Sequence, residues 1–355
     1  MSFLERFQKY KQVIDKELEL FLAPIVKKYK QSINADVYQE IYAYVMRGGK
    51  RLRALALFMA NKAVGGQNED QAIKLSSCVE LLHNSTLVHD DIIDRDDKRR
   101  NAPTFHIKFQ EFYKHIDDQN EEKIRRFGES VAILTGNILY ELGLEVIYHL
   151  QIPDKIKSKL VEIYATTYRK VNEGQLLDLA FEERFDITEK EYYEMVQLKT
   201  GALFEAALLM GVTLAQGSDS QIDTFVSFGI PAFTAFQIQD DILGTFGTTD
   251  KWGKNVESDL REGKRTLLVI KTLEKLSGTD REFFISTIGN AKATSEELER
   301  VRNLIKNSGT LDYAKTTTKE LIIRAKNQLI TETSLKKEGL EFFEAFADFL
   351  ISRAY

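Results

Sequence analysis

Residues that interrupt helices are rare along this chain, and their rarity constrains the fold more than any other feature of the sequence. The 355 residues include only 4 prolines and 20 glycines, while 43% of the chain is hydrophobic. Proline breaks the interior of a helix and glycine weakens it, so a shortage of both favours long helices. The hydrophobic fraction is large enough for a sizeable core. The sequence therefore predicts an all-α protein.

The organisation of the chain gives no sign of a division. There is no repeat of fixed period and no linker rich in serine and proline, so we expect one continuous helical domain over residues 1–355. The length alone leaves the number of domains open.

Charge and cysteine content limit the partners and the compartment. A net charge of −5 argues against general affinity for nucleic acid, although a local basic pocket can still hold a small anion. The single cysteine, Cys78, excludes an intramolecular disulfide and a cysteine metal cluster, which fits the reducing cytoplasm. The first residues, MSFLERFQKYKQ, are charged throughout, and no run approaches the ~20 apolar residues of a membrane span. We therefore expect a cytoplasmic protein without a membrane span.

A cluster of aspartates lies in a segment that otherwise has the apolar pattern of a helix from Asp70 to Asp94. Asp90 and Asp94 are four residues apart and share one helix face, and Asp91 lies beside them. Like charges at this spacing destabilise a helix, so the cluster calls for a compensating cation. Oxygen ligands without cysteine suit Mg²⁺, which makes a metal the simplest compensation.

A second aspartate pair, Asp240 and Asp241, follows 150 residues after the first in the segment FQIQDDILG. Either pair alone is equally consistent with a solvated acidic face. Two pairs on apolar segments favour metal binding, because charged residues are seldom buried without partners.

Several basic elements accompany the acidic ones. A glycine pair, Gly48-Gly49, precedes Lys50 to Arg53, where the backbone can turn sharply and cations can surround a phosphate. His83 lies two helical turns before Asp90. Pro103 is expected to end the helix, and Arg99 and Arg100 lie where a loop could fold back over a bound anion. Each element alone also fits an ordinary surface loop or a structural residue.

The second half of the chain also combines an acidic motif with basic residues. A capping box at Thr188–Glu191 predicts a helix through Leu208, and this helix carries Lys199 in an apolar turn. A second capping box is predicted at Thr294–Glu297. The helix with the second aspartate pair is predicted to end at Gly244, followed by a glycine-rich basic loop from Thr245 to Arg265. Metal sites and cations together suggest a diphosphate ligand, and the apolar residues before the first aspartates suggest that its ester is hydrophobic.

These motifs resemble the trans-isoprenyl diphosphate synthases, the family of farnesyl and geranylgeranyl diphosphate synthases. The resemblance covers nearly the whole chain and rests on GGKRLR at 48–53, HxxxxxxDDIID at 83–94, RR at 99–100, GQxxD at 174–178, KT at 199–200, FQIQDD at 236–241 and a GK…DLREGKRT loop. It implies an antiparallel helical bundle around a deep central cavity, a homodimer, and two aspartate clusters that face each other across the mouth of the cavity.

The resemblance also assigns the site. Three Mg²⁺ ions would be held by Asp90, Asp94 and Asp240. Asp91 and Asp241 would support these ligands without binding the metal themselves. The residues implied for the allylic diphosphate are Arg99, Lys199, Thr200, Gln237, Lys254 and Lys264. Those implied for isopentenyl diphosphate are Lys50, Arg53, His83 and Arg100. The enzyme would then be a prenyltransferase that extends an allylic diphosphate by five carbons.

Product length follows from the residues below the first aspartate. Thr86 and Ser85 lie four and five residues before Asp90, about 6–8 Å deeper at ~1.5 Å per residue. Both are small, where an aromatic side chain would stop growth near fifteen carbons. We therefore expect a product of C20 or longer, most similar to geranylgeranyl diphosphate, with Leu82 helping to set the limit.

Four positions depart from the family pattern: Ala54, Asn101, Asn137 and Gly244. Gly244 matters most, because many members carry aspartate there. Two alternative functions stay open, a class I terpene cyclase and a non-catalytic partner subunit of a prenyl synthase. The predicted isopentenyl diphosphate residues argue against the first, and the intact aspartates argue against the second.

Overall fold

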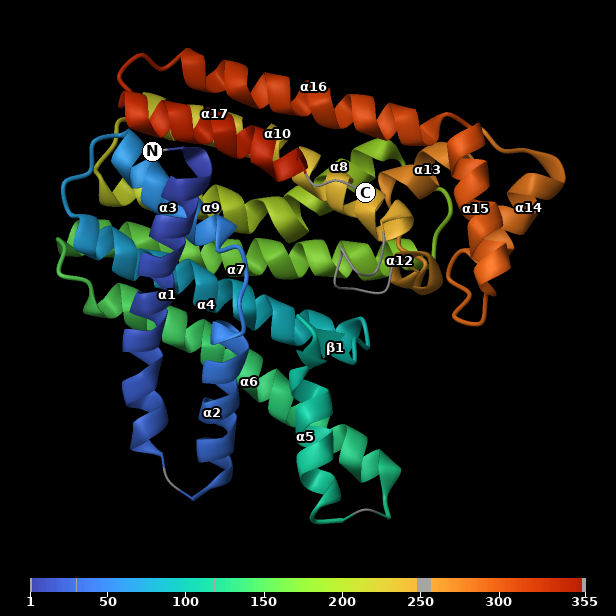
Figure 1. The fold of residues 1–355 in the computed structure, drawn as a ribbon, viewed down its shortest axis with the longest axis horizontal. Helices are drawn as coiled ribbons and strands as arrows, with labels where there is room; N and C mark the ends of the chain where they lie inside the picture. The colour runs from blue at the N-terminus through green and yellow to red at the C-terminus, as the bar shows by residue number, and fades with distance from the viewer. Residues whose placement is uncertain (1, 30, 118, 248–256, 353–355) are drawn as a thin grey trace. The chain divides into compact units, whose positions relative to one another are not determined.

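A computed structural model of the chain describes residues 2–29, 31–117, 119–247 and 257–352 (Figure 1). Across these residues the protein is helical apart from one hairpin of two short strands, which confirms the all-α prediction. The chain divides into two compact units. The N-terminal unit comprises Met1–Ala165 and Leu209–Gly217, and the C-terminal unit comprises Thr166–Leu208 and Ser218–Tyr355. The single continuous domain expected from the sequence stays a prediction.

The N-terminal unit contains the first acidic motif. Its elements are α1 (Phe3–Lys28), α2 (Ile33–Met46), α3 (Leu52–Ala63), α4 (Glu69–Ile93), β1 (Lys98–Arg99), β2 (Ala102–Pro103), α5 (Phe105–Lys114), α6 (Glu121–His149), the start of α7 (Asp154–Glu182) and the end of α9 (Ala202–Leu214). The helix α1 continues through Pro24, although proline disfavours the interior of a helix. Its buried residues Leu18 and Leu22 show that core packing outweighs the helix-breaking tendency of proline here.

The helix α4 agrees with the predicted helix from Asp70 to Asp94, but Pro103 is not the residue that ends it. It stops at Ile93 with Asp94 as its C-cap, so the prediction that Pro103 ends the helix is wrong. Pro103 instead lies in β2, which pairs with β1. The turn between them places Arg100 and Asn101 at φ values of 53° and 59°, the left-handed pair typical of a tight two-residue hairpin.

The glycines of α6 allow close helix packing. A Cβ atom on Gly136 would lie 2.1 Å from Nε2 of His89 in α4, and one on Gly143 would lie 2.2 Å from the hydroxyl of Tyr164 in α7. Any side chain at these positions would force α4 and α7 away from α6.

The C-terminal unit contains the second acidic motif. Its elements are the rest of α7, α8 (Glu189–Val196), the π-helical turn η1 (Gln197–Gly201), the start of α9, α10 (Asp219–Phe246), α12 (Ser258–Glu262), α13 (Leu267–Leu273), α14 (Gly278–Thr287), α15 (Ser295–Asn307), α16 (Thr310–Ile330) and α17 (Lys337–Ile351). Figure 1 shows α16 and α17 running side by side along α10, and both helices pack against it. Edge-to-face contacts between Phe343 and the rings of Phe225 and Phe228, at 5.1 and 5.3 Å, join α17 to α10.

Helix starts in this unit follow local sequence signals. The predicted capping boxes at Thr188 and Thr294 both form, each with the glutamate three residues later. The predicted end of α10 at Gly244 is wrong, since the helix continues to Phe246 with Gly247 as its C-cap.

Two helical stretches are long and apolar enough to cross a membrane, Glu121–His149 and Glu189–Leu214. In their most apolar windows, 50% and 67% of the residues are buried within the protein, as in core helices of globular domains. This is weak support for a span, and the expectation that the chain has none stays a prediction.

Candidate functional site

Neighbouring aspartates in the first acidic motif have different environments. The Asp91 side chain is completely buried, whereas that of Asp90 is 22% exposed. Both oxygens of Asp91 accept hydrogen bonds: the hydroxyl of Tyr44 in α2 donates to Oδ2 at 2.9 Å, and Nε of Arg99 donates to Oδ1. Asp91 is therefore held by the protein, and Asp90 and Asp94 lie on the more accessible side of the helix end.

Arg99 supplies part of the positive charge that the sequence assigned to a metal. The hairpin returns Arg99 to the end of α4, where it pairs with Asp91 and lies 3.6 Å from Asp90 and 3.5 Å from Asp96. Burial raises the pKa of Asp91 to about 6, against the opposing effect of Arg99 and Tyr44. The same burial raises the pKa of the Tyr44 hydroxyl well above its usual value, so this group stays a hydrogen-bond donor.

The second acidic motif has the same arrangement. Asp241 is 6% exposed and Asp240 is half-buried. The hydroxyl of Tyr192 in α8 donates to Oδ2 of Asp241 at 2.7 Å, and the side-chain amide of Gln237 donates to Oδ1 at 2.9 Å. Burial raises the pKa of Asp241 to about 8, the donors lower it, and the charges of Asp259 and Asp240 raise it further.

Gly244 makes room for a carboxylate from another helix. A Cβ atom on Gly244 would lie 2.2 Å from Oδ2 of Asp259 in α12. Gly244 follows Asp240 by four residues and lies on the same face of α10. The carboxylate of Asp259, the first residue of the DLREGKRT motif, thus occupies the space beside Gly244.

The residues predicted for isopentenyl diphosphate lie in the N-terminal unit, and the structure brings three of them together. Arg53 Nη1 donates to His83 Nε2 at 3.2 Å, and Arg100 Nη1 donates to the Gly48 carbonyl at 2.6 Å. Gly48 and its neighbour Gly49 have φ values of 107° and 128°, which favour glycine. Burial, followed by the charges of Arg53 and Arg100, holds the pKa of His83 well below its usual range, so the imidazole is neutral.

The two remaining cationic residues of the GGKRLR motif, Lys50 and Arg51, lie in different environments. Lys50 is exposed. Arg51 is 3% exposed and pairs with Glu80 at 3.0 Å and Asp15 at 2.8 Å, so its role is structural.

In the C-terminal unit, Lys199 and Thr200 lie in the π-helical turn η1, an irregularity often found at functional sites. Nζ of Lys199 lies 2.5 Å from Oδ2 of Asp178 in α7. The Thr200 hydroxyl donates to Oε1 of Gln237 at 2.8 Å. Gly174 permits this packing, because a Cβ atom there would lie 2.2 Å from the Lys199 backbone nitrogen. The GQxxD and KT motifs therefore form one contact.

The basic loop is described only in part. Lys264 Nζ lies 3.4 Å from Glu262, and Lys254 lies outside the described residues. Of the residues predicted to limit the product, Leu82 and Ser85 are 1% and 0% exposed, while Thr86 is half-buried and donates to the His83 carbonyl at 2.8 Å.

The donors fit Mg²⁺ bound jointly by protein and substrate. Within the described ranges, no three His, Cys, Asp or Glu side chains form a group that could hold a metal alone. Mg²⁺ is commonly bound by one or two carboxylates together with substrate phosphates, rather than by a complete protein cage. The half-buried Asp90, Asp94 and Asp240 suit this mode of binding.

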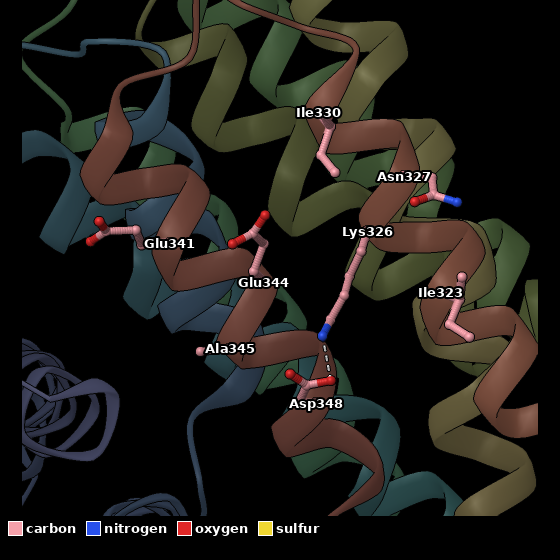
Figure 2. A pocket seen from close by; sticks show the side chains of 8 residues that line it. All are labelled: Ile323, Lys326, Asn327, Ile330, Glu341, Glu344, Ala345 and Asp348. Atoms are coloured by element: carbon pink, nitrogen blue, oxygen red, sulfur yellow. Dashed lines mark hydrogen bonds and ion pairs between the residues drawn. The ribbon is translucent and has the colours of Figure 1, made fainter.

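One groove of about 590 Å³ lies between α16 and α17, and Figure 2 shows its lining. Nζ of Lys326 and Oδ1 of Asp348 meet across it at 2.5 Å. The groove contains none of the predicted site residues, so it has no part in the predicted chemistry.

Sequence reasoning missed four residues of the site: Tyr44, Asp178, Tyr192 and Asp259. Tyr44 and Tyr192 are 47 and 49 residues from the aspartates that they contact, and no local pattern marks them. Asp178 was visible as the last residue of the GQxxD motif, but no ligand role was assigned to it.

Comparisons with known proteins bear on the family. A family model described as polyprenyl synthetase matches residues 35–305. The geranylgeranyl diphosphate synthase of Saccharolobus solfataricus is 35% identical over 291 residues, which cover 81% of this chain and 82% of that protein. That of Sulfolobus acidocaldarius is 34% identical over 327 residues, covering 91% and 93%.

Solved structures agree with the sequence relatives. Geranylgeranyl pyrophosphate synthetase from Pyrococcus horikoshii has a TM-score of 0.82 at 30% identity, covering 99% of this chain and 98% of that one. A polyprenyl synthase from Caulobacter crescentus, solved with calcium and isoprenyl diphosphate, has a TM-score of 0.82 at 26% identity, covering 99% and 97%. The predicted class of enzyme, an isoprenyl diphosphate synthase and hence a prenyltransferase, is confirmed. This chain belongs to the polyprenyl synthetase family.

Proposed function

We propose that the protein is a Mg²⁺-dependent synthase that condenses isopentenyl diphosphate head to tail with an allylic diphosphate and releases geranylgeranyl diphosphate or a longer product. The observation that carries the product length is the small, fully buried Ser85 in the helix turn before Asp90. The names of the relatives support the same range, since they include geranylgeranyl and geranylfarnesyl diphosphate synthases.

Asp90, Asp94 and Asp240 would hold the metal, with three ions per active site. The metal supplies charge that stabilises the departing diphosphate of the allylic substrate. Asp91 and Asp241 support these ligands through the protein, because their own oxygens accept hydrogen bonds from Tyr44, Arg99, Tyr192 and Gln237.

The residues that would bind the allylic diphosphate are Arg99, Lys199, Thr200, Gln237, Lys254 and Lys264. In the described structure, Lys199 and Arg99 are both paired with carboxylates, so an incoming diphosphate would compete with Asp178 and Asp91 for them. These ion pairs keep the cations in place before the substrate arrives. They would then offset the charge that develops as the allylic C–O bond breaks.

Isopentenyl diphosphate would bind through Lys50, Arg53, His83 and Arg100. The contact between Arg53 and His83, and that between Arg100 and the glycine pair, support a preformed cationic pocket. The double bond of isopentenyl diphosphate attacks the allylic carbocation, and the departing diphosphate takes the proton that is then released. One carbon–carbon bond forms and the chain grows by five carbons.

The assembly and the compartment are further parts of this proposal. Ile133 and Leu134 of α6 are 49% and 61% exposed, which supports a homodimer that covers them. Cys78 is the only cysteine and is a free thiol, which supports a cytoplasmic location. Light scattering of the purified protein tests the dimer.

The deciding experiment incubates purified protein with Mg²⁺, isopentenyl diphosphate and, separately, dimethylallyl, geranyl or farnesyl diphosphate. Mass spectrometry measures the chain length of the products. We expect elongation to C20 or beyond, which EDTA abolishes. Farnesyl diphosphate as the sole end product would contradict the product length. A cyclic hydrocarbon would favour a cyclase, and an inert protein would favour a partner subunit.

A further inference from the structure

The two acidic motifs share one feature that bears on how the proposed metal ligands are positioned. In each motif the second aspartate is buried and accepts a hydrogen bond from the hydroxyl of a buried tyrosine. The oxygen-to-oxygen distance is 2.9 Å for Tyr44 and Asp91 in the N-terminal unit, and 2.7 Å for Tyr192 and Asp241 in the C-terminal unit.

Each tyrosine comes from a helix other than the one that carries the aspartates. Tyr44 lies near the end of α2 and is 2% exposed, while Tyr192 lies in α8 and is 1% exposed. The ring of Tyr44 packs against Phe105 at 5.3 Å, and that of Tyr192 packs against Tyr193 at 5.6 Å. Packed rings hold the hydroxyls in fixed positions.

A buried carboxylate needs a donor for each oxygen, because an unpaired oxygen away from water is costly. In both motifs the tyrosine supplies one donor, and a side chain near the aspartates supplies the other: Arg99 to Asp91 and Gln237 to Asp241. Without the hydroxyl, the buried carboxylate would have to turn toward another donor or toward the metal.

Successive residues of an α-helix point about 100° apart. Fixing the second aspartate against a neighbouring helix therefore fixes the rotation of the helix about its axis at that point. This rotation decides where Asp90 and Asp240 project. Both of these residues are half-buried, in contrast to their buried neighbours.

We propose that Tyr44 and Tyr192 are positioning residues for metal binding, each acting through the second aspartate of its motif. The inference rests on the proposed function, because it takes Asp90, Asp94 and Asp240 to be the Mg²⁺ ligands. Neither tyrosine is among the residues proposed to bind the metal or the substrates.

Tyr164 offers a matched control. It is also fully buried, and its hydroxyl donates at 2.7 Å, but the acceptor is the backbone carbonyl of Tyr140 rather than an aspartate. Replacing any of the three tyrosines by phenylalanine removes one buried hydroxyl and preserves the ring. All three variants therefore lose one buried hydroxyl, and only Y44F and Y192F lose a hydrogen bond to an acidic motif.

The test uses the full-length variants Y44F, Y192F and Y164F. Calorimetry measures the affinity for inorganic pyrophosphate at several Mg²⁺ concentrations, steady-state assays give the Mg²⁺ concentration for half-maximal activity, and thermal unfolding gives stability. We expect Y44F and Y192F each to raise the Mg²⁺ requirement for pyrophosphate binding about 10-fold or more, in line with other partners of metal ligands. We expect Y164F to lower stability and leave the Mg²⁺ requirement unchanged.

Two results would overturn the inference. One is a Mg²⁺ requirement in Y44F and Y192F that matches the wild type; the other is an equal rise in Y164F. If Y44F does not fold, Y192F in the other unit decides the question by the same criteria. The proposed function is judged separately, since it fails if the wild type binds pyrophosphate with Mg²⁺ but elongates no allylic substrate.

Discussion

Replacing Gly244 by alanine is expected to lower activity at limiting Mg²⁺ and to leave the stability of the protein almost unchanged. The new Cβ atom would lie 2.2 Å from Oδ2 and 3.1 Å from Cγ of Asp259, so this carboxylate must retreat on the order of 1 Å to reach ordinary contact. Asp259 lies beside the second aspartate pair, and its charge raises the pKa of Asp241. The substitution therefore displaces one carboxylate of this motif and leaves Asp240 and Asp241 unchanged.

The stability change should be small, because two effects oppose each other. Gly244 lies inside α10, where alanine gains about 1 kcal/mol of helix propensity. Overpacking typically costs about 1–3 kcal/mol, and the lower end applies because the displaced atoms are the end of a side chain. We expect the free energy of unfolding in urea to change by at most about 1 kcal/mol. Activity at limiting Mg²⁺ should fall about 10-fold, as when other partners of metal ligands are lost.

Gly229→Ala is the control, since Gly229 lies in the same helix and its new Cβ would meet only the end of the Leu208 side chain, at 3.0 Å. This variant should keep the Mg²⁺ dependence of the wild type. Gly244→Asp restores the residue common in the family and should be worse than alanine, because its carboxylate would compete with Asp259 for one space. Wild-type activity at limiting Mg²⁺ in Gly244→Ala would refute the reasoning.

Three further predictions concern other positions. Arg99→Gln should lower the free energy of unfolding by roughly 3–5 kcal/mol, because it leaves the charge of the buried Asp91 uncompensated. Adding Asp91→Asn should recover most of this loss. If urea unfolding shows that the losses of the two substitutions add, the pairing of Arg99 with Asp91 is refuted. Ser85→Phe should shorten the main product to C15 by mass spectrometry, while Thr86→Val should not; an unchanged product in Ser85→Phe would contradict the pocket assignment. Cys78 is 0% exposed and burial raises the pKa of its thiol, so a thiol reagent at pH 8 should react only after unfolding; rapid reaction of the native protein would show that the thiol is accessible.

Much of the helical structure follows from local sequence signals. The span of α4 and the capping boxes at Thr188 and Thr294 were predicted because they depend on residues a few positions apart. The errors occur where distant contacts outweigh local preference. Gly244 does not mark the end of α10, which continues to Phe246. A glycine at this position instead leaves room for Asp259, fifteen residues further along the chain.

The charge argument for a metal was incomplete for the same reason. Three carboxylates at the end of α4 do require positive charge, but Arg99 supplies part of it once the hairpin folds back. From the sequence alone, Arg99 was equally consistent with solvent exposure and with a loop that folds back, and only the turn at Arg100 and Asn101 distinguishes the two. The metal assignment is consequently better supported by the accessible carboxylates than by repulsion among all three.

A pair of adjacent aspartates in a helix cannot present both carboxylates in one direction, because the two side chains diverge by about 100°. Sequence alone does not show which of the two faces the interior. In both motifs it is the second, and each buried carboxylate has two donors within its own unit. Because Asp91 and Asp241 are satisfied by the protein, the proposed metal binding falls to Asp90, Asp94 and Asp240. Replacing either buried aspartate should therefore act on stability as well as on Mg²⁺ affinity, whereas replacing an accessible aspartate should act mainly on Mg²⁺ affinity.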